Sequence, residues 1–70
     1  MKKIVYVMST NSIGVVLDEG QERGLTWYRT DCDGVREKHD LLFLGNLDAV
    51  KEAMKAGAMI APSTKQMIGL

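Results

Sequence analysis

The residues best suited to chemistry lie between 27 and 40, in the segment WYRTDCDGVREKHD. It holds the only tryptophan of the chain, the only cysteine (Cys32) and the only histidine (His39). A cysteine nucleophile needs an orienting base nearby, and a zinc site usually needs four ligands in tetrahedral geometry. In a hairpin that turns at Asp33-Gly34, Cys32 would pair with Val35, several residues from His39. No Cys or His pair has zinc-like spacing, so we expect no catalytic, metal or cofactor site here.

Acidic and basic side chains alternate through the same segment. Paired carboxylates act as acid and base where burial separates their pKa values. Alternation with bases favours cross-strand ion pairs instead, such as Arg29 with Glu37, each contributing less than about 1 kcal/mol at a surface. The acids are Asp31, Asp33, Glu37 and Asp40, and the bases are Arg29, Arg36 and Lys38.

The size and composition of the chain predict one domain over residues 1–70, β-rich in 1–45, with a helix and tail in 46–70. Nine Lys+Arg balance nine Asp+Glu, and this neutrality offers no basic face for nucleic acid. A single cysteine forms no internal disulfide, which indicates a reducing compartment. The apolar run Ile4–Met8 is too short for a signal peptide or a membrane span. We therefore expect a soluble cytoplasmic protein that does not bind membranes.

Turn signals divide the first 45 residues into strands. Glu19–Gly24 is expected to be a polar loop, and Asp33-Gly34 a type I′ turn. Gly14 lies within a strand and suggests a bulge or a close backbone approach. Leu41–Leu44 fits either a buried strand or a short helical turn. The predicted strands are Lys3–Met8, Ile13–Asp18, Leu25–Cys32 and Val35–His39.

A helix is predicted over residues 47–56, with Asn46 as N-cap and Gly57 after its end. Residues 58–61 would form a last short strand, and the tail from Ser63 either a helical turn or a loosely docked terminus. The fold class is therefore α+β: a small, strongly bent antiparallel sheet of four or five strands with one C-terminal helix.

The aromatic residues of the third strand are expected to point in opposite directions. Trp27 shares a face with Leu25 and is predicted to anchor the core. Tyr28 would then point outward and form a binding surface with Arg29, Arg36 and Lys38. A second candidate surface is the alanine- and methionine-rich side of the helix and the residues after it, namely Ala53, Met54 and Met59, which would contact a partner protein or a second copy of the chain.

Residues 12–44 resemble the core of an SH3-like small β-barrel of the KOW or Tudor-like kind. The matching positions are Gly14-Val15-Val16, Asp33-Gly34 and Asp40-Leu41-Leu42. The resemblance implies a non-enzymatic binding module whose ligands lie along one face of the barrel. This sequence lacks the positive face of the basic members of that family, and its C-terminal helix is an addition to the family pattern.

These observations favour a non-catalytic interaction or regulatory protein whose partner is another protein. The alternative is a nucleic-acid-binding module that uses the aromatic and basic strand face. A small enzyme or a metal-binding protein is the least favoured class.

Overall fold

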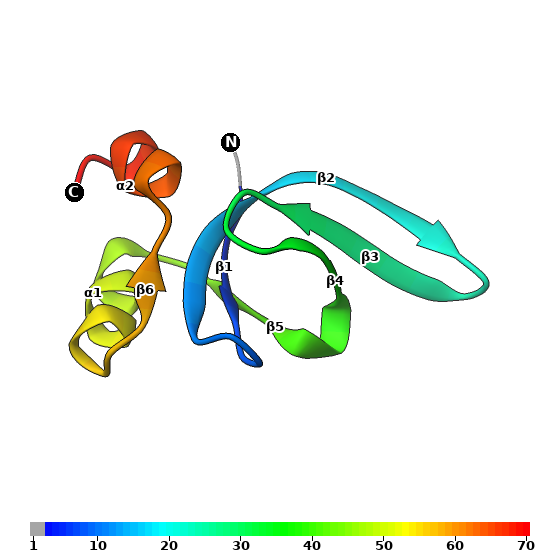
Figure 1. Ribbon diagram of the computed structural model, residues 1–70, viewed down its shortest axis with the longest axis horizontal. Helices are drawn as coiled ribbons and strands as arrows, with labels where there is room; N and C mark the ends of the chain where they lie inside the picture. The colour runs from blue at the N-terminus through cyan, green and yellow to red at the C-terminus, as the bar shows by residue number, and fades with distance from the viewer. Residues whose placement is uncertain (1–2) are drawn as a thin grey trace.

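The computed structural model describes residues 3–70, and the predicted domain's residues 1 and 2 lie outside this range. The described chain has the expected α+β class: a bent, open antiparallel sheet with two short helices (Figure 1). The strands are β1 (Ile4–Val7), β2 (Ser12–Glu22), β3 (Leu25–Thr30), β4 (Gly34–Glu37), β5 (Leu41–Leu44) and β6 (Met59–Ile60). A 3-10 turn, η1 (Lys38–Asp40), precedes β5, and the α-helices are α1 (Leu47–Lys55) and α2 (Pro62–Ile68).

The strand order is β4-β3-β2-β1-β5, and β2 holds the sheet together by changing partners along its length. Its first residues pair with β1 on one edge and, in parallel, with β6 on the other. From Val16 onward the second edge pairs with β3 instead, with a register shift between Val16 and Asp18. A bulge of this kind bends a strand, and it carries β2 and β3 away from the rest of the sheet as a projecting arm (Figure 1).

The central strands are covered on both faces. One face carries the core cluster of Val5, Val7, Val16, Tyr28 and Leu41. Because side chains alternate along a strand, Ile13 and Val15 of β2 point the opposite way, toward the side on which α1 and α2 lie (Figure 1). Ile13, Val15 and Val50 of α1 are all buried, so the C-terminal elements complete a second apolar layer.

The predicted helix is confirmed, and so is its N-cap. The side chain of Asn46 accepts a hydrogen bond of 2.8 Å from the backbone N–H of Ala49, which satisfies one of the free donors of the first turn. Gly57 follows the helix with a φ of 100°. The tail forms α2, with Pro62 in its first turn. Within residues 3–70, neither helix has the length and hydropathy to cross a bilayer.

Both turn predictions in the first half are wrong. Glu19–Gly24 is not a loop: β2 continues to Glu22, and the chain reverses at Arg23-Gly24, whose φ angles of 52° and 79° are both positive. This is the two-residue turn that was expected at Asp33-Gly34. A polar sequence can remain a strand here because the arm is solvated and needs only the ladder with β3.

The turn between β3 and β4 is longer than predicted. Thr30 pairs with Gly34, so the connection has three residues, 31–33, and Gly34 supplies the positive φ (69°) at its end. Three-residue hairpins commonly close with a glycine in this way. The register aligns Val35 with Arg29, not with Cys32, and Glu37 with Trp27. The predicted Arg29–Glu37 pair is therefore not formed.

Candidate functional site

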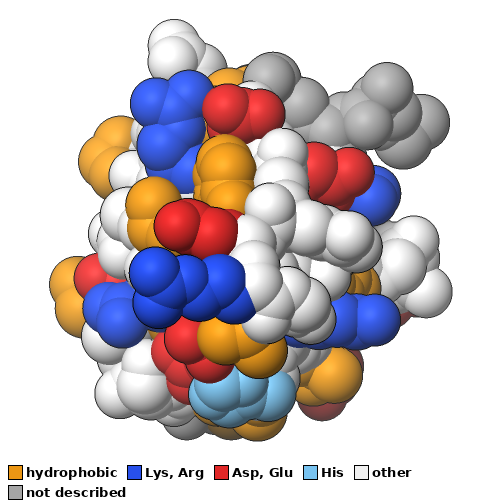
Figure 2. All heavy atoms as spheres, turned by 90° about the vertical axis from the view of Figure 1, so that its right-hand side faces the viewer, with side chains coloured by type: hydrophobic (Ala, Val, Ile, Leu, Met, Phe, Trp, Pro, Cys, Tyr) orange, Lys and Arg blue, Asp and Glu red, His pale blue; other side chains and the backbone are white. Residues whose placement is uncertain are grey.

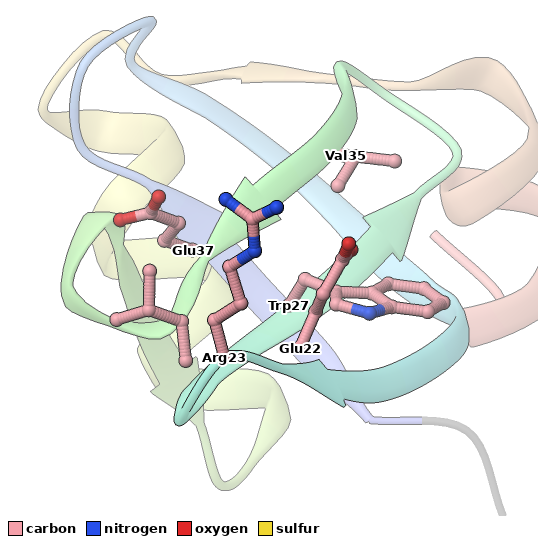
Figure 3. Close-up of a pocket in the computed structure, with 6 residues that line it drawn as sticks. Glu22, Arg23, Trp27, Val35 and Glu37 are labelled. Carbon is pink, nitrogen blue, oxygen red and sulfur yellow. The ribbon is translucent and has the colours of Figure 1, made fainter.

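The outer face of the β3–β4 sheet carries an open groove. Trp27 and Leu25 project from β3 and Val35 from β4, and Glu22, Arg23 and Glu37 complete the lining of a depression of about 450 Å³ (Figure 3). Leu25 and Val35 are 55% and 58% exposed. Figure 3 shows Trp27 and Glu22 on one side, Glu37 on the other and Arg23 between them.

Trp27 lies flat on the arm because β2 has a glycine opposite it. Gly20 and Trp27 are register partners, and a Cβ at position 20 would lie 2.5 Å from the indole ring. The missing side chain lets the ring pack directly on the β2 backbone. Glycine inside a strand often marks such a close approach, and here it half-buries Trp27 on an outward face.

The rim of the groove carries both signs of charge. Two of its charged residues are acidic and one is basic. Oε2 of Glu37 also lies 3.2 Å from Nδ1 of His39 in η1. Seen from the tip of the arm, acidic, basic and hydrophobic side chains are interspersed, with no broad field of one sign (Figure 2). The surface thus combines an apolar floor with a polar rim, the usual composition of a protein contact site.

The predicted orientation of the two β3 aromatics is wrong. Tyr28 is 8% exposed and belongs to the core cluster, whereas Trp27 is on the outer face. The Tyr28 ring packs edge-on against Phe43, with centroids 5.3 Å apart. The assumption that the largest side chain must fill the core overlooked Gly20, which gives the indole a flat surface outside. A buried Tyr28 cannot serve as the contact residue proposed for it.

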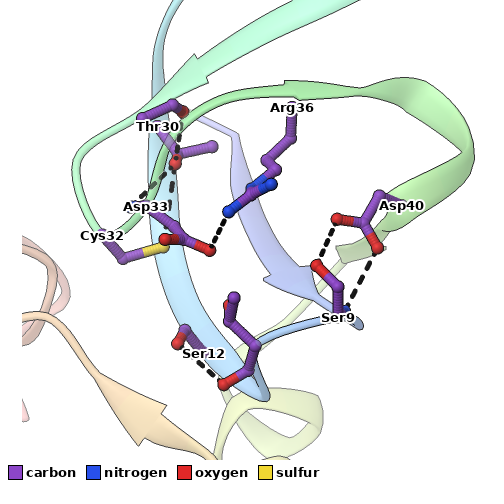
Figure 4. Close-up of polar contacts among 9 residues, drawn as sticks. Ser9, Ser12, Thr30, Cys32, Asp33, Arg36 and Asp40 are labelled. Atoms are coloured by element: carbon purple, nitrogen blue, oxygen red, sulfur yellow. Dashed lines mark hydrogen bonds and ion pairs between the residues drawn. The ribbon is translucent and has the colours of Figure 1, made fainter.

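The basic residues of the predicted strand surface do not share one face. Arg29 is exposed and alternates with Tyr28, so it points outward with Trp27. Arg36 is the register partner of Tyr28 and points the other way, where it binds Asp33 at 2.9 Å (Figure 4). Lys38 is exposed in η1. The combination of a stacking aromatic with three bases, expected for nucleic acid, is therefore not assembled on one surface.

The predicted helix-side surface is only partly accessible. Ala53 and Met54 of α1 are half-buried, whereas Met59 of β6 is 74% exposed. Most of the apolar arc of α1 is thus used in packing. Met59 is an exposed apolar side chain, and single exposed apolar side chains are common on proteins.

Cys32 and His39 occupy separate environments. Cys32 lies in the β3–β4 connection, where its thiol contacts the Thr30 hydroxyl at 3.8 Å, while His39 contacts Glu37. Burial raises the pKa of the Cys32 thiol, which opposes the thiolate form that a nucleophile needs. Within the part of the chain that the structure describes, no three His, Cys, Asp or Glu side chains are grouped to hold a metal.

Asp31 is the best-connected polar residue, and sequence reasoning assigned it only a surface ion pair. One carboxylate oxygen accepts from the Val15 N–H at 2.8 Å, and the other from the hydroxyls of Ser63 and Thr64, each at 2.6 Å. Burial would raise the pKa of Asp31, but these hydrogen bonds outweigh it and hold the pKa below its usual value. Asp31, which directly follows β3, therefore links the start of α2 to β2. The sequence does not reveal this role of Asp31, because its partners Ser63 and Thr64 are far away in the chain.

Further polar side chains fix the turn after β1 and the connection between β3 and β4. Asp40 accepts from both the backbone and the hydroxyl of Ser9, at 3.1 and 2.6 Å (Figure 4). Thr30 donates to the Gly34 carbonyl at 2.9 Å and accepts from the Asp33 N–H. A hydrogen bond from Thr10 and the Arg36 guanidinium lower the pKa of Asp33. These contacts satisfy polar groups of the loop backbone.

Comparison with protein-family models, with curated proteins and with solved structures found no match to this chain.

Proposed function

We propose that the protein is a non-catalytic module that binds another protein through the groove of Trp27, Leu25 and Val35. The observation that carries this proposal is the apolar surface on the outward face of β3 and β4, where Leu25 and Val35 are exposed and Trp27 is half-buried. A cluster of large apolar side chains on a solvated strand face costs solubility, and it usually marks an interaction site. Tryptophan is also among the residues that contribute most to protein contacts.

The environment of the groove supports the same proposal. The indole is held by Gly20 before any partner arrives, so little side-chain entropy is lost on binding. The charged rim would exclude water from the contact and select among partners. The resemblance of residues 12–44 to SH3-like cores agrees with ligand binding along the strands of one sheet face.

The proposal is tested by comparing two lysine substitutions at exposed apolar positions. Val35→Lys places a charge in the groove, and Met59→Lys places one on β6, outside it. Tagged wild-type and variant proteins are cross-linked in extract of the native host, and the captured partner is quantified by mass spectrometry. Circular dichroism confirms that each variant is folded, as expected for side chains that are more than half exposed.

We expect Val35→Lys to reduce capture of the partner at least ~10-fold, the effect of ~1.4 kcal/mol, and Met59→Lys to leave it unchanged. Equal capture by both variants would refute the groove as the contact surface. Loss of capture, or of self-association by sedimentation, in Met59→Lys alone would assign the contact to the surface of Ala53, Met54 and Met59 instead.

A further inference from the structure

β4 is an edge strand that borders the groove. It pairs with β3 alone, and among the strands of residues 3–70 none lies along its other edge. Three of its four residues are exposed, and only Arg36 is half-buried. The outer edge of such a strand presents N–H and C=O groups to which an extended segment of another chain can add as a further strand.

The surroundings of β4 leave space for such a segment. The groove lies on its outer face, and a second depression, of about 370 Å³, lies between β4, η1 and Ser9. Both depressions are lined by Val35 and Glu37. The strand begins at Gly34 and the chain turns into η1 after Glu37, so the added segment would be short.

The sheet register determines which side chains of an added strand would enter the groove. Gly20, Trp27 and Glu37 form one cross-strand row on the outer face, and Asp18, Arg29 and Val35 form the next. A strand added beside β4 would extend each row by one residue. Its two outward residues would lie opposite Glu37 and Val35 and would be separated by one inward residue.

The chemistry of those two positions defines the ligand. Opposite charges are favourable cross-strand neighbours, and apolar β-branched side chains pack well against their neighbours on a pleated sheet. Glu37 would therefore select a lysine or arginine, and Val35 a valine or isoleucine two positions away. The exposed Arg29 lies in the row of Val35, so a basic residue is favoured only at the position opposite Glu37.

We infer, on the basis of the proposed function, that the partner contributes a short extended segment with a basic residue two positions from a β-branched apolar residue, and that this segment adds to β4. A second copy of the chain fits less well. Full antiparallel pairing of β4 with itself would set the outward Val35 opposite the inward Arg36 of the other copy, and the two grooves would face opposite sides of the joined sheet.

Trp27 is the only tryptophan of the chain, so its fluorescence reports on the groove. The probe is the peptide acetyl-Val-Thr-Lys-Thr-Val-amide, which sets lysine opposite Glu37 and valine opposite Val35 in either strand direction. The matched control peptide carries glutamate in place of lysine. Glu37→Lys reverses the charge at the binding position, and Glu52→Lys makes the same change on exposed α1, outside the groove.

We expect the lysine peptide to change Trp27 fluorescence saturably, at least ~10-fold more tightly than the glutamate peptide. Glu37→Lys should reverse this preference, and Glu52→Lys should leave it intact. Binding should also slow amide exchange along β4. Equal affinity for both peptides, no binding of either, or an unchanged preference in Glu37→Lys would overturn the inference. The proposed function would still stand after these results if Val35→Lys no longer captured the partner protein. It would fail, independently of the peptide results, if Val35→Lys captured the partner as well as wild type does.

Discussion

The two halves of β2 differ in almost every respect although they are one continuous strand. Residues 12–16 are buried or half-buried, with strands on both edges and apolar layers on both faces. In residues 17–22 every residue is exposed except Gly20, which is half-buried. The first half contributes apolar burial to folding, whereas the second is ordered by its ladder with β3 and the turn at Arg23-Gly24. Substitutions should therefore cost stability in the first half and change the groove in the second.

The two glycines inside β2 show the same contrast on a smaller scale. A Cβ at Gly14 would lie 2.5 Å from both Asp31 Oδ1 and Cys32 Sγ, and a Cβ at Gly20 would lie 2.5 Å from the Trp27 ring. Each glycine thus leaves space for a neighbouring side chain. At Gly14 that neighbour is fixed by hydrogen bonds, whereas at Gly20 it lies beside an open groove.

The largest expected effect is at Tyr28. Its side chain fills the core cluster, so Tyr28→Ala should lower the free energy of unfolding by about 4 kcal/mol. Trp27→Ala should cost only about 1 kcal/mol, as for a half-exposed side chain on the arm. Urea unfolding monitored by circular dichroism measures both. Tyr28→Phe is the control, and it should be within about 1 kcal/mol of wild type because it keeps the ring. A greater loss in Trp27→Ala would mean that the arm is part of the core.

Gly14→Ala should have the next largest effect. The added methyl group meets a carboxylate that accepts three hydrogen bonds and cannot move freely. Overpacking of this kind costs about 3 kcal/mol. Gly45→Ala is the matched control, because nothing lies within 4 Å of its Cβ position, and it should change stability little. Similar unfolding midpoints in urea for the two variants would contradict the close approach.

The sequence was most informative where a pattern depends on neighbouring residues. Asn46 and Gly57 delimit α1 because caps are local, and Gly14 indicated a close approach because glycine has few other uses in a strand. The orientation of β3 was predicted incorrectly because Trp27 and Tyr28 differ by a single step of a period-2 pattern, and only the distant Gly20 decides between them. The role of Asp31 depends on Ser63 and Thr64, 32 and 33 residues away in the chain. Contacts across such separations leave no local pattern.

Asp31 should link stability to pH at the junction between the two halves of β2. Its pKa is below the unfolded value near 3.8, so its stabilising contribution is complete above that value and is lost as the pH falls through the folded pKa. Asp31→Asn should lower the free energy of unfolding by about 2 kcal/mol at neutral pH. It should also weaken the loss of stability below pH 3.8. Some loss should remain, because the pKa of Asp33 is lowered too. Urea titrations from neutral to acid pH measure this, and an unchanged acid slope would show that the carboxylate is unimportant.

Gly20→Ala should have the smallest effect on stability and a clear effect on the groove. The new methyl group would displace the indole, which can move outward because the groove beside it is open. Alanine also loses less backbone entropy than glycine on folding, so the net change should stay within about 1 kcal/mol. The fluorescence maximum of Trp27 should shift toward that of a more exposed indole, whereas Gly45→Ala should leave it unchanged. An unshifted maximum together with a large loss of stability would show that the arm is packed as rigidly as the buried half of β2. The groove would then be an extension of the core.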